Sequence, residues 1–174
     1  MTGSTLRVSL REITRHNLKA VLALDVSPEQ KNVYPRSNAY SIAEGHFPAD
    51  DDPVWMRAIY ANETPVGFLM TSEVPEDGIC FLWRIMIDEH HQGRGYGRRA
   101  VELLIQRIRE NGNPQSLLTS HLKGDGDASN FYKSLGFDYT GELMDGEDFM
   151  MKLDLQKQEP EQGRGGNGQR GATL

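Results

Sequence analysis

The chain has 174 residues, a net charge of −6, and 37% hydrophobic and 25% charged residues. This length and composition are typical of one globular domain with its own core, and the acidic balance argues against nucleic acid as a partner. No apolar run reaches the ~18–20 residues that would span a bilayer, and the first residues lack the apolar stretch of a secretory signal. The single cysteine, Cys80, excludes an internal disulfide, so we expect a cytoplasmic protein.

Apolar patterns predict elements in the order βααβββαβαββ, an α+β fold with a mixed, mostly antiparallel sheet flanked by helices. Strands are expected at 6–10, 54–61, 66–74, 79–88, 116–122, 137–143 and 147–153. Helices are expected around 18–24, at 38–46, at about 95–110 and at 127–135. The strand at 79–88 is apolar almost throughout, which predicts a central position. The helix that follows it predicts a parallel neighbour at 116–122.

The composition changes near the end of the chain. Residues 156–174 contain five glycines and no large apolar residue before Leu174. Such a segment buries too little surface to offset the entropy of ordering it. We therefore expect one domain at 1–155 and a disordered tail at 156–174.

The segment His91–Arg99 (HQGRGYGRR) lies between the buried strand and the start of a helix. Glycines let the main chain approach a ligand closely, and the helix dipole favours negative charge. Arg94, Arg98 and Arg99 add mobile positive charge, so the segment predicts a diphosphate site. It lacks the Lys-Ser/Thr of a Walker A loop and the G-x-G-x-x-G spacing of a dinucleotide fold.

The pattern Gln92-x-x-Gly95-x-Gly97 resembles the Q/R-x-x-G-x-G/A signature of the GCN5-related N-acetyltransferases. Residues 130–137 (NFYKSLGF) resemble the family's F-Y-x-x-x-G-F motif, and 85–88 (IMID) lie where the family has its central strand. The resemblance covers roughly 6–153. A narrower likeness is to bacterial spermine/spermidine acetyltransferases. It rests on the segments WRIMID at 83–88, PEQ at 28–30, SIAE at 41–44, TGE at 140–142 and DGE at 145–147.

The resemblance implies acetyl-coenzyme A (acetyl-CoA) as the acetyl donor. It implies that the main chain of Ile85, Met86 and Ile87 pairs with the pantetheine arm, and that Tyr132 is the general acid. The implied cofactor-binding residues in the glycine-rich segment and beyond are Gln92, Gly93, Arg94, Gly95, Tyr96, Gly97, Arg98 and Asn130. Where the family often has asparagine, this chain has Asp125, which can cap the following helix but cannot donate an N–H to the cofactor.

Acetyl transfer to an amine requires a neutral amine, a polarised carbonyl and a proton for the leaving thiolate. The residues that we expect to bind the amine, because carboxylates and aromatic faces attract ammonium groups, are Glu29, Tyr34, Glu44 and Glu73. The base stays open between Glu44, Glu73 and a chain of water molecules. The pair His90-His91 lacks a third ligand for a metal site, and Cys80 is expected to be a buried structural thiol.

The expected function is transfer of acetyl from acetyl-CoA to a primary amine, with a polyamine such as spermidine or spermine as acceptor. The alternatives are a protein N-terminal amine or an aminoglycoside as acceptor, and a module that binds coenzyme A without catalysis. The expected partner is a small-molecule amine, without nucleic acid or membrane, and a homodimer is left open.

Overall fold

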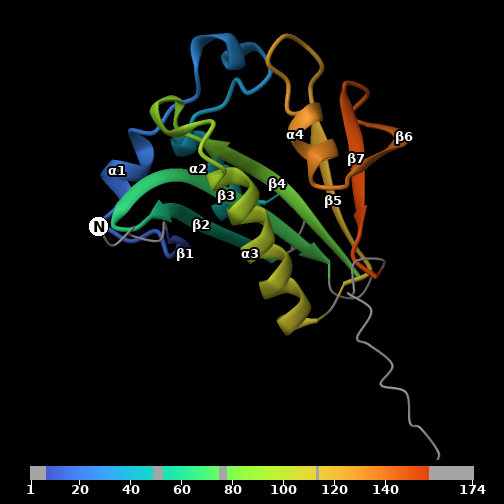
Figure 1. The fold of residues 1–174 in the computed structure, drawn as a ribbon, viewed down its shortest axis with the longest axis horizontal. Helices are drawn as coiled ribbons and strands as arrows, with labels where there is room; N and C mark the ends of the chain where they lie inside the picture. Colours follow the sequence, from blue (N-terminus) through green and yellow to red (C-terminus); the bar gives the residue numbers. More distant parts are fainter. Residues whose placement is uncertain (1–6, 49–52, 75–77, 113, 157–174) are drawn as a thin grey trace, which may run out of the picture.

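The computed structural model describes residues 7–48, 53–74, 78–112 and 114–156, which form a seven-stranded sheet with helices on both faces (Figure 1). The strands are β1 (Val8–Arg11), β2 (Val54–Ala61), β3 (Thr64–Val74), β4 (Ile79–Ile87), β5 (Ser116–His121), β6 (Asp138–Met144) and β7 (Asp148–Asp154). Their order is β1-β2-β3-β4-β5-β7-β6, and only the β4–β5 pair among these neighbours is parallel. The predicted fold class, the central place of β4 and its parallel neighbour are therefore confirmed.

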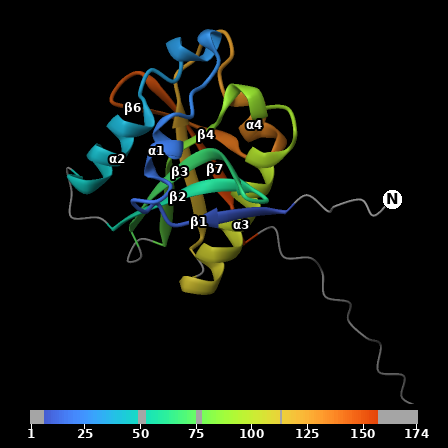
Figure 2. The same ribbon diagram turned by 90° about the vertical axis from the view of Figure 1, so that its left-hand side faces the viewer.

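The two faces of the sheet carry different helices. The helices are α1 (Leu18–Leu22), α2 (Asn38–His46), α3 (Tyr96–Asn111), α4 (Ser129–Ser134) and the short 3₁₀ helices η1 (Pro28–Asn32) and η3 (Glu89–His91). Helices α1 and α2 lie on one face, and α3 and α4 lie on the other (Figure 2). No helix in the described ranges is long and apolar enough to cross a membrane. The expected tail at 156–174 lies outside the described residues, apart from Gln156.

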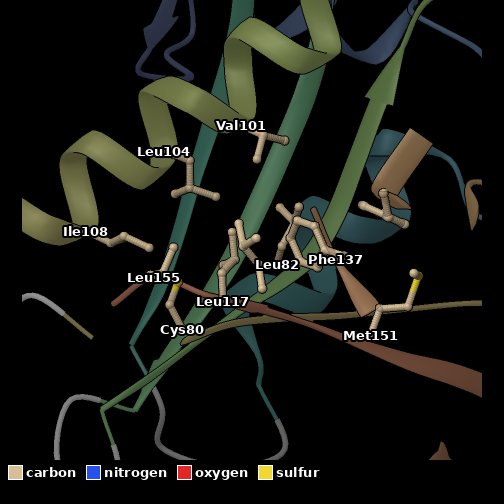
Figure 3. Packing of buried hydrophobic residues seen from close by; sticks show 11 residues of the cluster. Cys80, Leu82, Val101, Leu104, Ile108, Leu117, Phe137, Met151 and Leu155 are labelled. Atoms are coloured by element: carbon tan, nitrogen blue, oxygen red, sulfur yellow. The ribbon is translucent and has the colours of Figure 1, made fainter. Parts of the chain in front are cut away.

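The largest core lies between the sheet and helices α3 and α4 (Figure 3). The apolar stripe of α3 faces this core, where Val101 and Leu104 are fully buried and join Leu82 of β4 and Leu117 of β5 in one cluster. Burial of each such side chain contributes about 1.5–3 kcal/mol. This packing therefore holds the first halves of the two parallel strands together.

Cys80 belongs to the same core and is 2% exposed. Burial raises the pKa of its thiol to about 12, so the side chain stays protonated at neutral pH. The prediction of a buried structural thiol is confirmed.

The parallel ladder between β4 and β5 is short and ends within β4. Four residue pairs join the two strands, and the last of them is Leu82 with Thr119. At this point the register of β4 against β3 shifts, which leaves Trp83 as an extra residue in a β-bulge. Beyond the bulge the two strands diverge (Figure 1), and in the described chain 83–87 of β4 and 120–121 of β5 form no pairs with each other.

Asp88 follows β4 and fixes the chain on either side of it. Its carboxylate accepts hydrogen bonds from the amide of Asp25 at 3.2 Å, the amide of His90 at 3.1 Å and the ring of His91 at 3.1 Å. Burial alone would raise the pKa of Asp88, but these hydrogen bonds outweigh burial and lower the pKa below its ordinary value. The charged carboxylate thus joins the segment after α1 to the loop that leads into α3.

Replacing Asp88 by asparagine is expected to lower the free energy of unfolding by about 1–3 kcal/mol at pH 7, because hydrogen bonds to a charged acceptor are weakened. Since folding lowers the pKa of Asp88, its stabilising contribution is complete above pH ~4 and is lost as the pH falls through the folded-state pKa. The difference between wild type and Asp88→Asn, measured by urea denaturation, should therefore narrow in acid.

The matched control is Asp125→Asn, which removes the charge of an exposed carboxylate. An equal loss of stability in both variants would contradict the role assigned to Asp88.

Candidate active site

The divergence of β4 and β5 opens a cleft of about 1260 Å³ that reaches both faces of the sheet. On one face it is lined by the loop before α3 and by α4. On the other face it is lined by α2, by the chain after η1 and by the turn between β6 and β7. The lining residues include Tyr34, Glu44, Arg84, Gln92, Gly95 and Tyr132.

The glycine-rich segment forms the wall of the cleft at the start of α3. Gly93 and Gly95 have φ angles of +72° and +80°, in the left-handed region that favours glycine. Gln92 pins this loop in place, because its Nε2 donates to the carbonyl of Ile87 at 2.8 Å and to Oε1 of Gln30 at 2.7 Å. The first N–H groups of α3 have no acceptor within the helix, so this end of the cleft suits an anion.

The arginines of this segment are held by protein groups. Arg94 donates to a backbone carbonyl at 3.1 Å, and Arg99 donates to Glu102 at 2.9 Å. Arg98 donates to both the carbonyl and the hydroxyl of Ser134 at 2.9 Å, which links the first turn of α3 to the end of α4. These contacts hold the three guanidinium groups beside the loop, and their contribution to an anion site stays a prediction.

Helix α4 places Tyr132 at the fork between the two strands. Its ring packs against Phe131 at 5.3 Å and Phe137 at 5.4 Å between centroids, and the residue is 5% exposed. Burial raises the pKa of Tyr132, and hydrogen bonding to Thr119 and the positive charge of Arg84 only partly oppose that effect. The phenol therefore keeps its proton at neutral pH and can donate it.

The opposite wall of the cleft combines a cation, a carboxylate and a second phenol. Arg84 of β4 and Glu44 of α2 form an ion pair at 3.4 Å, with side chains 20% and 26% exposed. The hydroxyl oxygen of Tyr34 is buried and has no hydrogen-bonding partner among the described residues. Burial raises the pKa of Tyr34, and the charge of Arg84 opposes it, so this phenol is also protonated at neutral pH.

The structure brings most of the expected site residues to this one cleft. Those that line it are Tyr34, Glu44, Ile85, Met86, Ile87, Gln92, Gly93, Gly95, Tyr96, Gly97, Arg98 and Tyr132. The expected residues that do not line it are Glu29, Glu73, Arg94 and Asn130. The carboxylate of Glu73 instead pairs with Arg107 of α3, and Glu29 is exposed on η1. Neither carboxylate is placed to bind the amine, and Glu73 is not placed to act as its base.

The loop before α4 departs from expectation at one residue. Asp127, rather than Asp125, accepts hydrogen bonds there, from the amide of Ser129 at 2.9 Å and the amide of Gly124 at 3.4 Å. Burial would raise the pKa of Asp127, but the bonds from Ser129 and Gly124 lower it. Asp125 is exposed and forms no hydrogen bond within the described residues.

The polar residues that β5 and β7 contribute to the cleft were not predicted from the sequence. Ser120 and Asp148 both line it, and the hydroxyl of Ser120 donates to Oδ2 of Asp148 at 3.3 Å. His121 lines it as well, and its Nε2 lies 3.0 Å from the hydroxyl of Tyr139. The available signal was the run of three polar residues Thr119-Ser120-His121 near the end of the strand expected at 116–122.

Comparison with known proteins gives one family. A model of the acetyltransferase (GNAT) family matches residues 18–137. The probable spermine N(1)-acetyltransferase of Bacillus subtilis subsp. natto (strain BEST195) and the spermine/spermidine N(1)-acetyltransferase of Bacillus subtilis (strain 168) are each 30% identical to this chain over 152 residues. Each match covers 83% of this chain and 97% of the relative.

Solved structures agree with this chain in fold. The spermidine N-acetyltransferase of Vibrio cholerae, in complex with CoA and spermine, matches with a TM-score of 0.68 at 14% identity, over 86% of this chain and 96% of that one. An acetyltransferase of Thermus thermophilus matches with a TM-score of 0.67 at 22% identity, over 86% and 97%. Since the family model spans more than half of the sequence, the chain belongs to the GNAT family and is an acetyl-CoA-dependent N-acetyltransferase.

Proposed function

We propose that the protein acetylates a primary amino group of a polyamine, such as spermidine or spermine. The observation that carries the proposal is that a single cleft joins the glycine-rich loop, Tyr132 and the polar wall of Tyr34, Glu44 and Arg84. The names of the two Bacillus relatives, which match over nearly their whole length, support a polyamine as the acceptor.

The residues on the α3 side of the cleft fit coenzyme A. In the described chain Ile85–Ile87 form no ladder with β5, so, apart from the carbonyl of Ile87 that accepts from Gln92, the main-chain groups on that side can pair with the amides of the pantetheine arm. The amides from Gly93 to Arg98 surround the start of α3, where a diphosphate finds both N–H donors and the helix dipole. Acetyl-CoA supplies the activated acetyl thioester.

Tyr132 is the proposed general acid for the leaving thiolate. Its protonated phenol lies where β4 and β5 part, next to the proposed path of the pantetheine arm. The reaction consumes an ammonium and yields an amide, a thiol and one free proton. The ammonium loses two protons on its way to the amide: the first leaves to solvent before the amine attacks, and the second restores the phenol of Tyr132 after that phenol has protonated the thiolate. The Arg84–Glu44 pair on the facing wall carries no net charge, so it does not hold the amine as an ammonium in the way that an unpaired carboxylate would.

A small-molecule amine is the only partner that this function requires. We place this function in the cytoplasm, because the single cysteine is a buried, protonated thiol that forms no internal disulfide. The negative net charge does not favour nucleic acid as a partner.

Replacing Gly95 by valine is expected to abolish the binding of acetyl-CoA. Gly95 has a φ of +80°, and a β-branched residue there must shift the main chain and with it the proposed diphosphate site. Titration calorimetry with acetyl-CoA measures the loss. Gly112→Val is the control, because Gly112 lies at the other end of α3 with an extended φ of 173° and no atom within 4 Å of an added Cβ. If a folded Gly95→Val variant bound acetyl-CoA normally, the proposed position of the diphosphate site would be wrong.

Replacing Tyr132 by phenylalanine is expected to lower kcat about 10²-fold or more, within the usual range for removal of a general acid. The ring packing against Phe131 and Phe137 is kept, so the melting temperature and the Kd for acetyl-CoA should change little. Release of thiol, followed with a chromogenic disulfide, measures the rate. A variant with full activity would show that Tyr132 only packs in the core.

The acceptor is tested by the same thiol assay with spermidine, spermine, an aminoglycoside and a peptide with a free N-terminal amine. We expect the highest kcat/KM with spermidine or spermine. A preference for the peptide or the aminoglycoside would replace the polyamine as acceptor. Tight binding of acetyl-CoA with no turnover on any amine would indicate a binding module without catalysis.

A further inference from the structure

The two faces of β5 serve opposite sides of the cleft. Successive residues of a strand point to opposite faces, and Leu117 is buried with Val101 and Leu104 of α3, so Thr119 also faces α3 and α4. Leu118 and Ser120 therefore face the side of α2, where the proposed amine enters. The same rule applies to β7, where Met151 packs in the core with α3 and Asp148 lies on the other side.

Ser120 and Asp148 meet on this amine side of the cleft. Ser120 pairs with Met150 in the ladder between β5 and β7, and its hydroxyl donates to Oδ2 of Asp148 at 3.3 Å. Asp148 is half-buried, whereas Asp145 and Glu147, which also line the cleft, are exposed on the turn. Of these three carboxylates, Asp148 is therefore the one that belongs to a strand, β7, and is bound to a second strand through Ser120 of β5.

The charge of Asp148 is not balanced by a neighbour. Within the described ranges no lysine, arginine or histidine forms an ion pair with it. Glu44, on the facing wall, is already paired with Arg84 at 3.4 Å. A half-buried carboxylate without a counter-charge is a strong attractor for a cation, because solvent screens it less than an exposed one.

The two charged walls favour different states of an amino group. Beside the Arg84–Glu44 pair, whose charges cancel, an amine gains no net attraction as an ammonium and can take the neutral form that attacks the thioester. Beside Asp148 an amine is favoured as an ammonium, which cannot attack. The reacting nitrogen therefore belongs near Arg84 and Tyr132, and a nitrogen at Asp148 is one that does not react.

Both groups belong to the one cleft, on either side of β5. Thr119, which contacts the phenol of Tyr132, and Ser120, which holds Asp148, are consecutive residues whose side chains point to opposite faces, so one acceptor reaches both groups only by extending through the fork between β4 and β5. The apolar side chains of Leu118, Leu122 and Met150 line the same side of the cleft as Ser120 and can contact the methylene groups of a short alkyl spacer.

We propose that Asp148, oriented by Ser120, binds a second, non-reacting ammonium of the acceptor and so selects amines that carry at least two amino groups. This inference rests on the proposed polyamine acetylation and names the residue that distinguishes a polyamine from a monoamine in that site.

The test compares kcat/KM for spermidine with that for butylamine in wild type and in Asp148→Asn. Asparagine keeps the oxygen that accepts from Ser120, so mainly the charge is removed. For spermidine we expect a fall of about 10- to 100-fold, the range for loss of a hydrogen bond between charged groups, carried mostly by KM. For butylamine, which has no second ammonium, we expect no change.

Two further variants sharpen the result. Asp138→Asn removes a charge from an exposed residue of β6, is not part of the cleft lining, and should leave both substrates unaffected. Ser120→Ala keeps the charge of Asp148 but loosens its orientation, and should raise the KM for spermidine a few-fold.

Two outcomes overturn the inference. One is an equal loss for both amines in Asp148→Asn, and the other is an unchanged kcat/KM for spermidine. In both cases wild type still acetylates spermidine, so the proposed function stands. If the wild-type protein acetylates no polyamine, the proposed function and this inference are both wrong. The wild-type rate therefore tests the proposed function, and the comparison with Asp148→Asn tests this inference.

Discussion

The end of the parallel ladder at Leu82 and Thr119 is the constraint on which the site depends. The bulge at Trp83 turns β4 away from β5, yet the core beneath α3 and the bond from Thr119 Oγ1 to the carbonyl of Leu82 at 3.0 Å hold the strands together up to that point. If β4 and β5 were paired along their whole length, the main-chain N–H and C=O groups of β4 on that side would all be hydrogen-bonded to β5. The fork leaves that main chain open and gives the cleft its two entrances.

The fork also separates two kinds of chemistry. On the side of α3 and α4 the cleft presents main-chain N–H groups and the proton of a buried phenol, which suit a diphosphate and a leaving thiolate. On the side of α2 it presents charged side chains, Arg84, Glu44 and Asp148, which suit an amine. Because the two sets lie on opposite faces of one sheet, donor and acceptor can approach the fork together without competing for the same groups.

Much of the fold was predictable from the sequence because its signals are local. The apolar patterns that predict the strands and helices are each decided by a few neighbouring residues. The glycine-rich loop was found for the same reason. The placement of Glu73 was not, because its pairing with Arg107 on α3 joins residues that are far apart in the chain.

The amine side of the cleft could not be predicted, because it is formed by residues that are far apart in the sequence and meet only through strand pairing. Whether Ser120 points to α2 or to α4 follows from the register of β5 against β4 and β7, and a shift by one residue would exchange the two faces. Asp148 and Ser120 meet through strand pairing between elements separated by α4 and β6. Tyr34 also depends on a distant residue, because its buried hydroxyl lies close enough to Arg84 to feel that positive charge, and the two residues are far apart in the chain.

The link between Arg98 and Ser134 has a consequence for the choice of donor. It ties the loop proposed to hold the diphosphate to the short helix that carries Tyr132, so the separation of these two points is set by the protein rather than by the ligand. On that assignment the contact between Arg98 and Ser134 fixes the distance between the diphosphate site and the phenol of Tyr132. A thioester on a shorter or longer arm than pantetheine would have its sulfur out of register with the phenol, however well its phosphates were held.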